Sequence, residues 1–421
     1  MARIVILSVP AYGHLNPILP IAKELVRRGH DVIVFNEARF APLITDTGAS
    51  FVAYPPALTL DDFARVLKDG DLVAWFHLLL QSTGPLLRFV SRTLTKNRPD
   101  LILFDGVAIW GELAASNLHV PSISISTAFA FEATKQIGSL REVWRIVVSF
   151  LWYFPGLVVA WHRMVWGGMR TPPWRMPLMP RQGSLLTLML TSKSVHPATR
   201  LVDNPRFAFI GCSIEPLTRH EQFDFSRLDG RPLLYISLGT LHHGNTEFFR
   251  TCIAAFSDFD GQVLVSVGRG TDLAPFASAP DNFIFAEAVP QLAILERAQV
   301  FVTHAGLNSV HESLWNSVPM VAVPQQFEQL HNAQSLVAAG AGVLIDSETW
   351  GHPVSVTQLR DAVRDVIGNH DRYAAAARTL GKSLRDGGGY LAAVERIESY
   401  FDPHSGSVQP HRAKSTTAAQ G

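Results

Sequence analysis

Short apolar runs alternate with amphipathic stretches over the first third of the chain. The first run, 4–8, is rich in β-branched residues and is followed by a helical pattern over about 17–28, which Gly29 ends. Continuous apolar runs of this length are typical of parallel strands that are covered on both faces. The same pattern predicts three more strands, at 32–35, 101–104 and 122–126, and one more helix, at 110–117.

A second series of strands and helices follows a polar stretch at 213–231. It predicts five strands, at 233–238, 263–267, 283–285, 300–303 and 320–323, with a helix beginning near Thr246 and further helices over 356–401. Strands that alternate with helices favour parallel sheets, so the fold class is α/β with two sheets. The expected organisation is a first unit at 1–212, a linker at 213–231 and a second unit at 232–385. A C-terminal helix at 386–402 and a flexible tail at 403–421 follow.

The segment 130–180 differs from both series. It holds five of the nine tryptophans and has a helical, amphipathic pattern that Pro155-Gly156 is expected to break and Thr171-Pro172-Pro173 to end. Residues 146–161 are apolar, which is short of the roughly 20 residues that span a bilayer. Four arginines flank this run, so association with a membrane surface stays open as an alternative: Arg141, Arg145, Arg163 and Arg170.

Composition narrows the class of protein. The 421 residues are 47% hydrophobic and 17% charged, which excludes general disorder. Lys+Arg and Asp+Glu balance at 36 each and no basic cluster occurs, so nucleic acid is a poor partner. Cys212 and Cys252 have no metal-ligand spacing and are expected to be buried thiols. The first apolar run is too short for a signal peptide, so a cytoplasmic location is expected.

The main chemical signal of the second unit is a strand, a small loop and a helix. The strand 300–303 leads through His304-Ala305-Gly306 to a helix that begins near Asn308. A helix N-terminus presents unpaired N–H groups and favours an anion, and the side chains of His304, Asn308 and Ser309 add donors suited to a diphosphate. Glu312 shares their face one turn deeper, where it would accept hydrogen bonds from a ribose diol. Alternatively, Asn308 and Ser309 are ordinary helix caps and Glu312 is a surface charge.

The first unit offers a candidate general base. Its first strand is followed by Gly13-His14-Leu15-Asn16-Pro17, which lacks the glycines of a dinucleotide fingerprint. His14 is expected at the carboxyl edge of the sheet, where α/β proteins bind ligands. Asp105 ends another strand, reaches the same edge and would orient the imidazole. The alternative is that His14 only caps or packs against a helix.

The residues 289–332 resemble the donor-binding signature of the UDP-glycosyltransferase superfamily, and most closely that of bacterial macrolide and flavonoid glycosyltransferases. They include Val289-Pro290-Gln291, Thr303 to Glu312, and Glu328-Gln329. The resemblance implies a GT-B fold, in which two Rossmann-like domains face each other across a cleft. The second domain would hold the nucleotide, and the C-terminal helix would return to the first.

The resemblance also assigns roles. It places the donor at Val289, Gln291, His304, Gly306, Asn308, Ser309 and Glu312, and the sugar hydroxyls at Glu328 and Gln329. Ser237, Gly239 and Thr240 match a second phosphate contact, and Thr127 matches a residue near the sugar 6-hydroxyl. The family usually has an aromatic residue that stacks on the base where this chain has Ala288, so either another ring supplies the stack or the base is recognised more weakly. UDP is the preferred nucleotide, and TDP is possible.

The reaction implied by the resemblance is inverting transfer of a sugar, with glucose from UDP-glucose as the expected donor. His14 would be the base and Asp105 its partner, and neither a metal nor another cofactor is expected. Asp258-Phe259-Asp260 is interpreted as a loop. Aromatic residues of 130–180 would contact a small apolar or aromatic acceptor, namely Trp144, Trp152, Phe154 and Trp161. The alternatives are a lipid acceptor at a membrane surface, a nucleotide-sugar epimerase of the same fold, and a nucleotide-sugar sensor without turnover.

Overall fold

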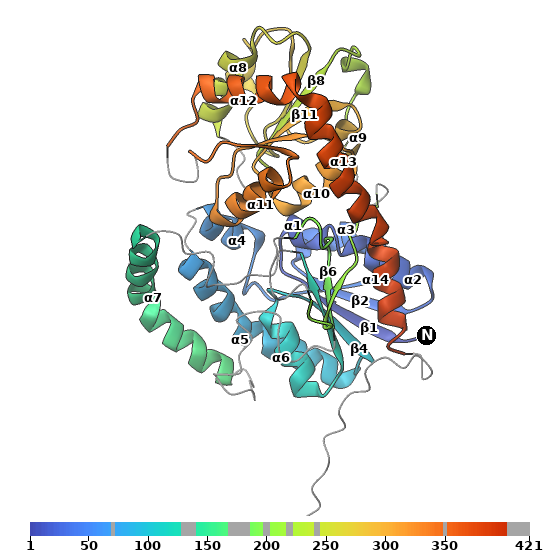
Figure 1. Cartoon of the computed structure of the whole chain (residues 1–421). Coiled ribbons are helices and arrows are strands. Elements are labelled where there is room, and N and C mark those ends of the chain that lie inside the picture. The colour runs from blue at the N-terminus through green and yellow to red at the C-terminus, as the bar shows by residue number, and fades with distance from the viewer. Residues whose placement is uncertain are drawn as a thin grey trace, which may run out of the picture.

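The protein consists of two α/β units, one above the other in Figure 1. The computed structural model describes residues 1–68, 72–127, 140–166, 186–196, 203–215, 222–239, 245–347 and 352–401. The first unit holds a parallel sheet of seven strands in the order β3-β2-β1-β4-β5-β6-β7. Its strands are β1 Arg3–Leu7, β2 Asp31–Asn36, β3 Ser50–Ala53, β4 Leu101–Asp105, β5 Ser122–Ser126, β6 Leu186–Met189 and β7 Phe207–Phe209.

The second unit holds a parallel sheet of six strands in the order β10-β9-β8-β11-β12-β13. Its strands are β8 Leu233–Ser237, β9 Gln262–Ser266, β10 Phe283–Ala286, β11 Ala298–Thr303, β12 Met320–Ala322 and β13 Gly342–Leu344. The two-sheet α/β class is therefore confirmed. Asp258-Phe259-Asp260 lies between α8 Thr246–Phe256 and β9, which agrees with its interpretation as a loop.

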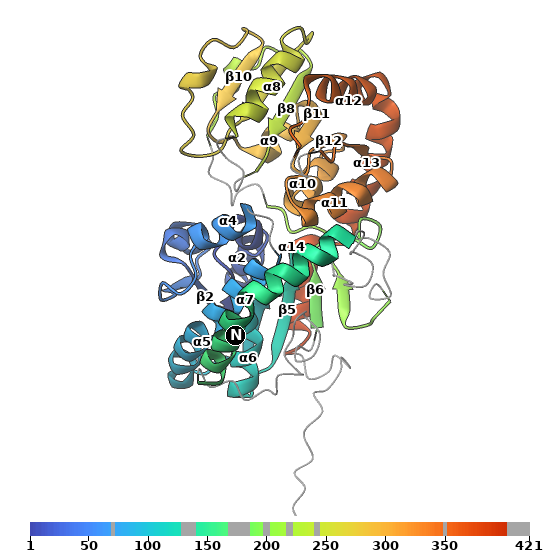
Figure 2. The ribbon, with the colours of Figure 1, turned by 90° about the vertical axis from the view of Figure 1, so that its left-hand side faces the viewer.

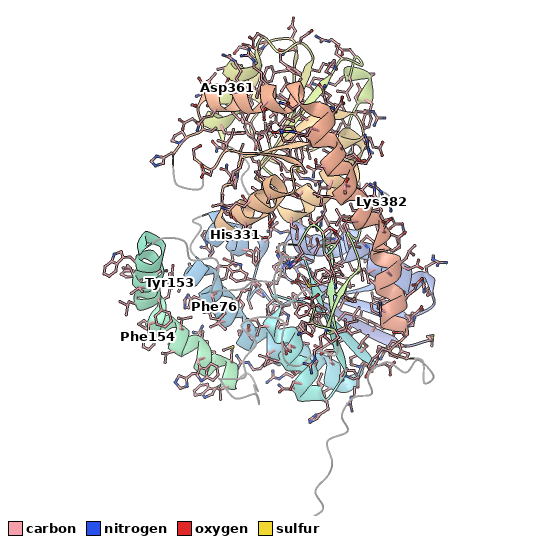
Figure 3. All side chains as sticks on the ribbon, viewed as in Figure 1. Phe76, Tyr153, Phe154, His331, Asp361 and Lys382 are labelled. Atoms are coloured by element: carbon pink, nitrogen blue, oxygen red, sulfur yellow. The ribbon has the colours of Figure 1, made fainter. Side chains whose placement is uncertain are left out.

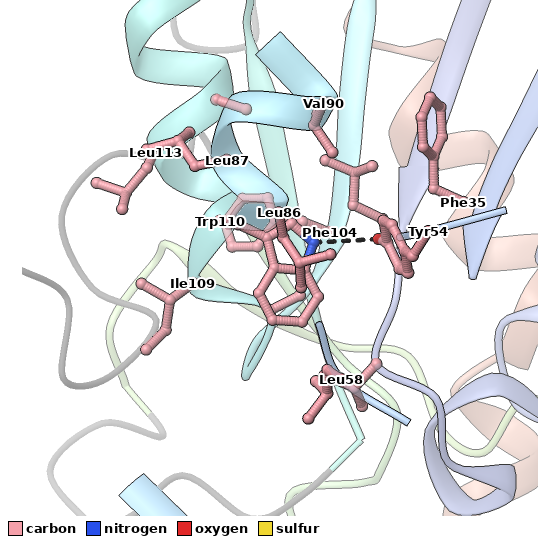
Figure 4. Close-up of a cluster of buried hydrophobic side chains, with 14 of the residues drawn as sticks. Phe35, Tyr54, Leu58, Leu86, Leu87, Val90, Phe104, Ile109, Trp110 and Leu113 are labelled. Atoms are coloured by element: carbon pink, nitrogen blue, oxygen red, sulfur yellow. Dashed lines mark hydrogen bonds between the residues drawn. The ribbon is translucent and has the colours of Figure 1, made fainter. Parts of the chain in front are cut away.

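Helices cover both faces of the first sheet. Alternate residues of β1 serve different cores: Ile4 and Ile6 pack with α2 Leu19–Arg27, whereas Val5 and Leu7 pack with α5 Leu72–Lys96 and α6 Ile109–Leu118. Figure 4 shows the second of these cores. There the buried indole N–H of Trp110 donates to the Tyr54 hydroxyl at 3.1 Å, which satisfies both polar groups.

Further helices complete both units. In the first unit they are α1 Tyr12–Leu15, α3 Ala41–Thr45, α4 Leu60–Lys68 and α7 Leu140–Trp166. In the second they are α9 Gln291–Leu295, α10 Leu307–Trp315, α11 Phe327–Ala338, α12 Val356–Gly368 and α13 His370–Asp386. Cys212 and Cys252 are free and buried, as the sequence predicts.

The chain crosses between the units twice, and the two crossings lie side by side. The N–H of Gly389 donates to the carbonyl of Ile210 at 2.6 Å. Gly387 is packed so closely that a Cβ there would lie 2.4 Å from the Gly211 nitrogen. After the second crossing, α14 Gly389–Glu398 packs against α2 of the first unit (Figure 1). The expected return of the C-terminal helix is confirmed, although positive φ angles at Gly388 and Gly389 delay its start beyond residue 386.

Helix α7 is continuous from Leu140 to Trp166, so the predicted break at Pro155-Gly156 is wrong. A proline inside a helix removes one N–H donor, and packing against a neighbouring helix offsets that loss. The neighbour here is α5. The absence of a side chain at Gly156 permits the close approach, because a Cβ there would lie 2.3 Å from Nε2 of His77. The predicted end at 171–173 lies outside the described residues. None of the helices in the described ranges is long and apolar enough to cross a membrane.

Candidate active site

His14 and Asp105 meet at the carboxyl edge of the first sheet. His14 lies in the short helix α1, just after β1, and Asp105 is the last residue of the adjacent strand β4. Nδ1 of His14 lies 2.7 Å from Oδ2 of Asp105, and the other carboxylate oxygen accepts the N–H of Val107 at 3.0 Å. The carboxylate is 1% exposed and the imidazole 20% exposed. A buried acceptor thus orients a ring that solvent still reaches.

Both hydrogen-bond partners of the His14 ring lie at the same nitrogen. The hydroxyl of Thr127 is 2.9 Å from Nδ1, beside the Asp105 contact. The carboxylate favours a proton on Nδ1, which leaves a lone pair on Nε2. Across the residues that the structure describes, Nε2 has no hydrogen-bond partner. Phe63 lies edge-on to the imidazole, with 5.9 Å between ring centroids. The arrangement is that of a general base with one nitrogen anchored and the other available.

The pKa of His14 is raised above the ordinary value of 6.5, as the balance of opposing effects. Burial is the largest effect and lowers the pKa, because it disfavours the imidazolium. The charge and hydrogen bond of Asp105, together with the charge of Glu328, outweigh it. A higher pH is therefore needed to deprotonate the His14 ring to its neutral, proton-accepting form than is needed for a free histidine.

The turn between β11 and α10 has a strained backbone. Ala305 is buried and has φ of 61°, a left-handed conformation that alanine rarely adopts. Its N–H donates to the hydroxyl of Thr303 at 3.3 Å, and the Asn332 amide donates to its carbonyl at 2.9 Å. The first hydrogen bond within α10 runs from Val310 to Gly306, so the N–H groups of 307–309 lie outside the helical ladder. The turn thus presents an anion-binding helix terminus.

The imidazole of His304 fits between two glycines beside this terminus. A Cβ at Gly239 would lie 2.6 Å from Cε1 of His304, and one at Gly306 would lie 2.4 Å from Nε2. Gly239 also has φ of 77°, and its N–H donates to the Ser237 hydroxyl at 3.2 Å. The two glycines therefore provide the space that the His304 ring occupies. Thr240, the other residue expected at this turn, lies outside the described residues.

Asn308 and Ser309 are the second and third residues of α10, so they are not its N-cap, which is Gly306. The Gln291 amide lies 3.4 Å from the Ser309 hydroxyl and donates to the carboxylate of Glu312 at 2.7 Å. Glu312 is 2% exposed, so it is not a surface charge. The structure therefore brings Gln291, Ser309 and Glu312 together, as the predicted donor site requires.

The two halves of the predicted site meet directly. The amide of Asn308 donates to the carbonyl of Gly13 at 2.8 Å, which joins α10 to the short helix α1 that carries His14. Pro17, Ile214, Asn308 and Glu312 line a cavity of about 10 Å³, enough for one water molecule. The cavity is therefore too small to hold a ribose.

Comparison with known proteins shows the family. Residues 209–386 match the model of the UDP-glucoronosyl and UDP-glucosyl transferase family. An NDP-glycosyltransferase, YjiC of Bacillus subtilis, is 30% identical over 404 residues, which is 95% of this chain and 97% of that protein. The chain belongs to this glycosyltransferase family.

Two further proteins are similar to this glycosyltransferase over most of its length. The oleandomycin glycosyltransferase of Streptomyces antibioticus is 28% identical, covering 94% of this chain and 90% of that protein. The crystal structure of the glycotransferase of kitacinnamycin superposes with a TM-score of 0.77 at 31% identity, over 94% of this chain and 98% of that one. The GT-B architecture of this glycosyltransferase is thereby confirmed.

Other predicted donor residues of the glycosyltransferase have structural partners. The Gln329 side chain accepts the N–H of Gln325 at 2.9 Å and so orders the start of α11, whereas Glu328 is exposed there and close enough to raise the pKa of His14. The Val289 side chain is part of the hydrophobic core of the second unit. No group of three or more metal-ligating side chains was found within the described ranges.

The aromatic residues predicted to contact the acceptor lie on both sides of α7. Trp161 packs against the core of the first unit. Trp144, Trp152 and Phe154 are 68%, 81% and 51% exposed. Figure 3 shows Tyr153 of the same helix on the side toward Phe76 of α5. The acceptor contacts of these four residues stay predictions.

Three residues beside the site were not predicted from the sequence. The Asn332 amide donates to the Ala305 carbonyl, and the Tyr235 hydroxyl donates to the side-chain oxygen of Gln291 at 3.1 Å. Phe63 contacts the His14 ring. Asn332 closes the stretch that resembles the family signature, so its position was a usable signal. Phe63 comes from a helix far from any motif, and nothing in its sequence neighbourhood marks it.

Proposed function

We propose that this glycosyltransferase transfers glucose from UDP-glucose, with inversion, to a hydroxyl of a small apolar or aromatic natural product. One observation carries the proposal. His14, bound to Asp105 through Nδ1, lies in helix α1, which contacts the N-terminus of α10 through the hydrogen bond from Asn308 to Gly13. A proton acceptor and an anion-binding helix terminus are thus neighbours, as a displacement between a hydroxyl and a diphosphate ester requires.

In the proposed reaction, Nε2 of His14 removes the proton of the acceptor hydroxyl. The acceptor oxygen then forms a bond to the anomeric carbon, while the bond from that carbon to the diphosphate oxygen breaks and the nucleoside diphosphate leaves with the electron pair. Asp105 stabilises the imidazolium that forms. A single displacement inverts the anomeric configuration, so an α-linked donor gives a β-glycoside.

The charge of the leaving diphosphate would be stabilised at the start of α10. The turn at Ala305 positions the N–H groups of 307–309, and Gly239 and Gly306 position the His304 ring between them. Donors that are preorganised in this way stabilise developing charge strongly. We propose that Glu312 and Gln291 hold the ribose and base, and that Glu328 and Gln329 hold the sugar hydroxyls.

The acceptor class is supported by the relatives. The names of two similar proteins refer to oleandomycin and kitacinnamycin, both natural products. The proposed preference for UDP over TDP depends on Glu312, because a buried carboxylate that accepts hydrogen bonds from a ribose diol loses one of them with a deoxyribonucleotide. Donor entry would separate the units at the contact between Asn308 and Gly13, and closure would exclude water from the reaction.

A donor and acceptor panel tests this proposal. Purified protein is incubated with UDP-glucose, UDP-galactose, UDP-N-acetylglucosamine and TDP-glucose, each with a planar polyphenol, and the products are identified by mass spectrometry and proton NMR. The proposal predicts a β-glucoside from UDP-glucose as the main product. An α-linked product would contradict inversion, and a preference for another donor would contradict UDP-glucose. Conversion of the donor without acceptor into an epimerised sugar would favour an epimerase.

A further inference from the structure

Helix α7 exposes a large apolar surface on the side away from the protein. Of the fourteen large hydrophobic side chains that are exposed in the described residues, eleven belong to this one helix, so the surface is not random scatter. We call it the outer face of α7. It consists of Trp144, Val147, Val148, Phe150, Leu151, Trp152, Phe154, Val158, Val159, Val165 and Trp166.

The opposite face of α7 already supplies its attachment to the first unit. Ala160 and Met164 are fully buried there, and Tyr153 packs on the ring of His77 with 5.0 Å between centroids. Gly84 of α5 lies so close that a Cβ would be 2.7 Å from the Arg163 carbonyl. The helix is therefore apolar on two sides while the fold uses only one. An apolar face that the fold leaves uncovered is typical of a docking surface.

No element among the described residues covers the outer face of α7. Figure 2 views the molecule from this side, and α7 crosses the first unit with no other labelled element in front of it. A helix of 27 residues is about 40 Å long. Since no described helix can cross a membrane, a helix of this kind would lie in the plane of a lipid surface.

The charge pattern of the helix selects the occupant. Over its full length, 140–166, the helix contains three arginines, Arg141, Arg145 and Arg163, and one acidic residue, Glu142, so its charge is positive. Arg163 is exposed, and no ion pair to it was found within the described ranges. Three of the exposed side chains are tryptophans, the residue type that concentrates at the boundary between lipid headgroups and acyl chains. A cationic, tryptophan-rich apolar face complements an anionic lipid surface.

We infer that the outer face of α7 docks this glycosyltransferase on anionic lipid membranes. The apolar side chains insert at the headgroup boundary, and Arg163 pairs with a lipid phosphate. This inference does not depend on the identity of the sugar or the acceptor, and it assigns the exposed tryptophans to the membrane.

Vesicle sedimentation tests the inference with the full-length protein. The probe is large vesicles of phosphatidylcholine with about one third phosphatidylglycerol, compared with vesicles of phosphatidylcholine alone. The test variant is Val148→Glu with Val159→Glu, both on the outer face. The control variant is Val337→Glu with Leu391→Glu, which places the same charge at exposed apolar sites on α11 and α14. Thermal melting of each variant confirms that it is folded.

We expect the wild-type protein and the control variant to bind anionic vesicles at least about tenfold more strongly than the test variant, because two carboxylates on the apolar face oppose both insertion and charge attraction. Neutral vesicles and about 0.5 M salt should weaken binding. Equal binding by the test and control variants would overturn the inference. So would the absence of binding by the wild type, or a concentration-dependent dimer that only the test variant loses, because the outer face would then bind a second copy of the chain.

Discussion

The side-chain amide of Asn308 donates a hydrogen bond to the backbone carbonyl of Gly13, 295 residues earlier in the chain. This contact joins the second residue of α10 to the residue before His14. It places the N-terminus of α10, where a diphosphate is expected, beside the imidazole that is expected to accept a proton. The proposed mechanism depends on that neighbourhood, since the two groups belong to different units of the fold.

Substituting Asp105 should change the pH dependence of transfer as well as its rate. Asp105→Asn removes the charge and the ionic hydrogen bond that raise the pKa of His14, so burial, which lowers that pKa, becomes the dominant effect. The neutral base then persists to lower pH, and the acid limb of the rate profile should move down. We expect kcat to fall by about 10²–10⁴, with the donor KM nearly unchanged. An unmoved acid limb in steady-state assays from acid to neutral pH would separate Asp105 from the titration of His14.

Gly306 packs against the His304 ring, so a side chain at this position is expected to weaken donor binding. In Gly306→Ala the new methyl group would lie 2.4 Å from Nε2 of His304, so the ring must move away from the start of α10. We expect the affinity for UDP, measured by calorimetry, to fall by about tenfold. The control is Gly368→Ala, at the last residue of α12, where a Cβ meets no atom within 4 Å. Equal affinity in both variants would show that the position of the His304 ring does not matter for the diphosphate.

Glu312 should discriminate between ribose and deoxyribose. The wild-type protein is expected to bind UDP more tightly than 2′-deoxy-UDP, and Glu312→Gln should reduce that ratio, because a neutral amide accepts more weakly than a carboxylate. The shape of the side chain is kept, so Gln291 retains a neighbour at hydrogen-bond distance. Glu296→Gln, an exposed change after α9, is the control. A ratio unaltered by Glu312→Gln would place the ribose elsewhere.

The attachment of α14 to the first unit should be sensitive to acid. Hydrogen bonds from Arg27, with a further one from Arg28, lower the pKa of Glu24 to about 2, and Arg28 also contacts Glu398 of α14. The pKa in the folded state is below that in the unfolded state, so the stabilisation is present above about pH 4.5 and is lost as the pH falls toward 2.

Glu24→Gln should therefore lower the melting temperature at neutral pH by roughly 2–4 °C, and the difference should shrink below about pH 3. The exposed Glu395→Gln on α14 serves as the control. A deficit that stays constant across the pH range would mean that the Glu24 charge does not contribute.

The central strands were predictable because burial on both faces forces long apolar runs. The predicted strand 122–126 agrees with β5 residue for residue, and the runs at 4–8 and 233–238 agree with β1 and β8 to within one residue. Edge strands gave weaker signals. Ser50–Ala53 and Gly342–Leu344 are short and partly exposed, so the apolar runs within them, 51–53 and 343–344, are only three and two residues long.

Helix α5 was missed for a different reason. Gly84 and Pro85 lie in its middle and are residue types that disfavour a helix interior, but Gly84 allows α7 to approach and the helix continues through the proline. The break expected in α7 at Pro155 was wrong on the same grounds, because tertiary packing overrode a local signal.

The site was predictable where chemistry depends on local order in the sequence. The loop from His304 to Ser309 and the face shared with Glu312 follow from helical spacing, and Asp105 follows from its place at the end of a strand. The hydrogen bond between Asn308 and Gly13 was not predictable, because it depends on how the two units pack. The exposure of Trp144 and Trp152 was likewise not predictable, because the sequence of a helix that is apolar on two sides does not show which side faces the protein.

The most direct test of the account is to measure His14→Ala twice, once for sugar transfer and once for UDP binding by calorimetry. We expect transfer to fall to background, because the proposed proton acceptor is lost. The dissociation constant for UDP should stay within about twofold of that of the wild type, because the diphosphate is proposed to bind the second unit. Transfer that persists in His14→Ala would remove the imidazole from the reaction. Loss of UDP binding together with transfer would contradict the division of labour between the two units.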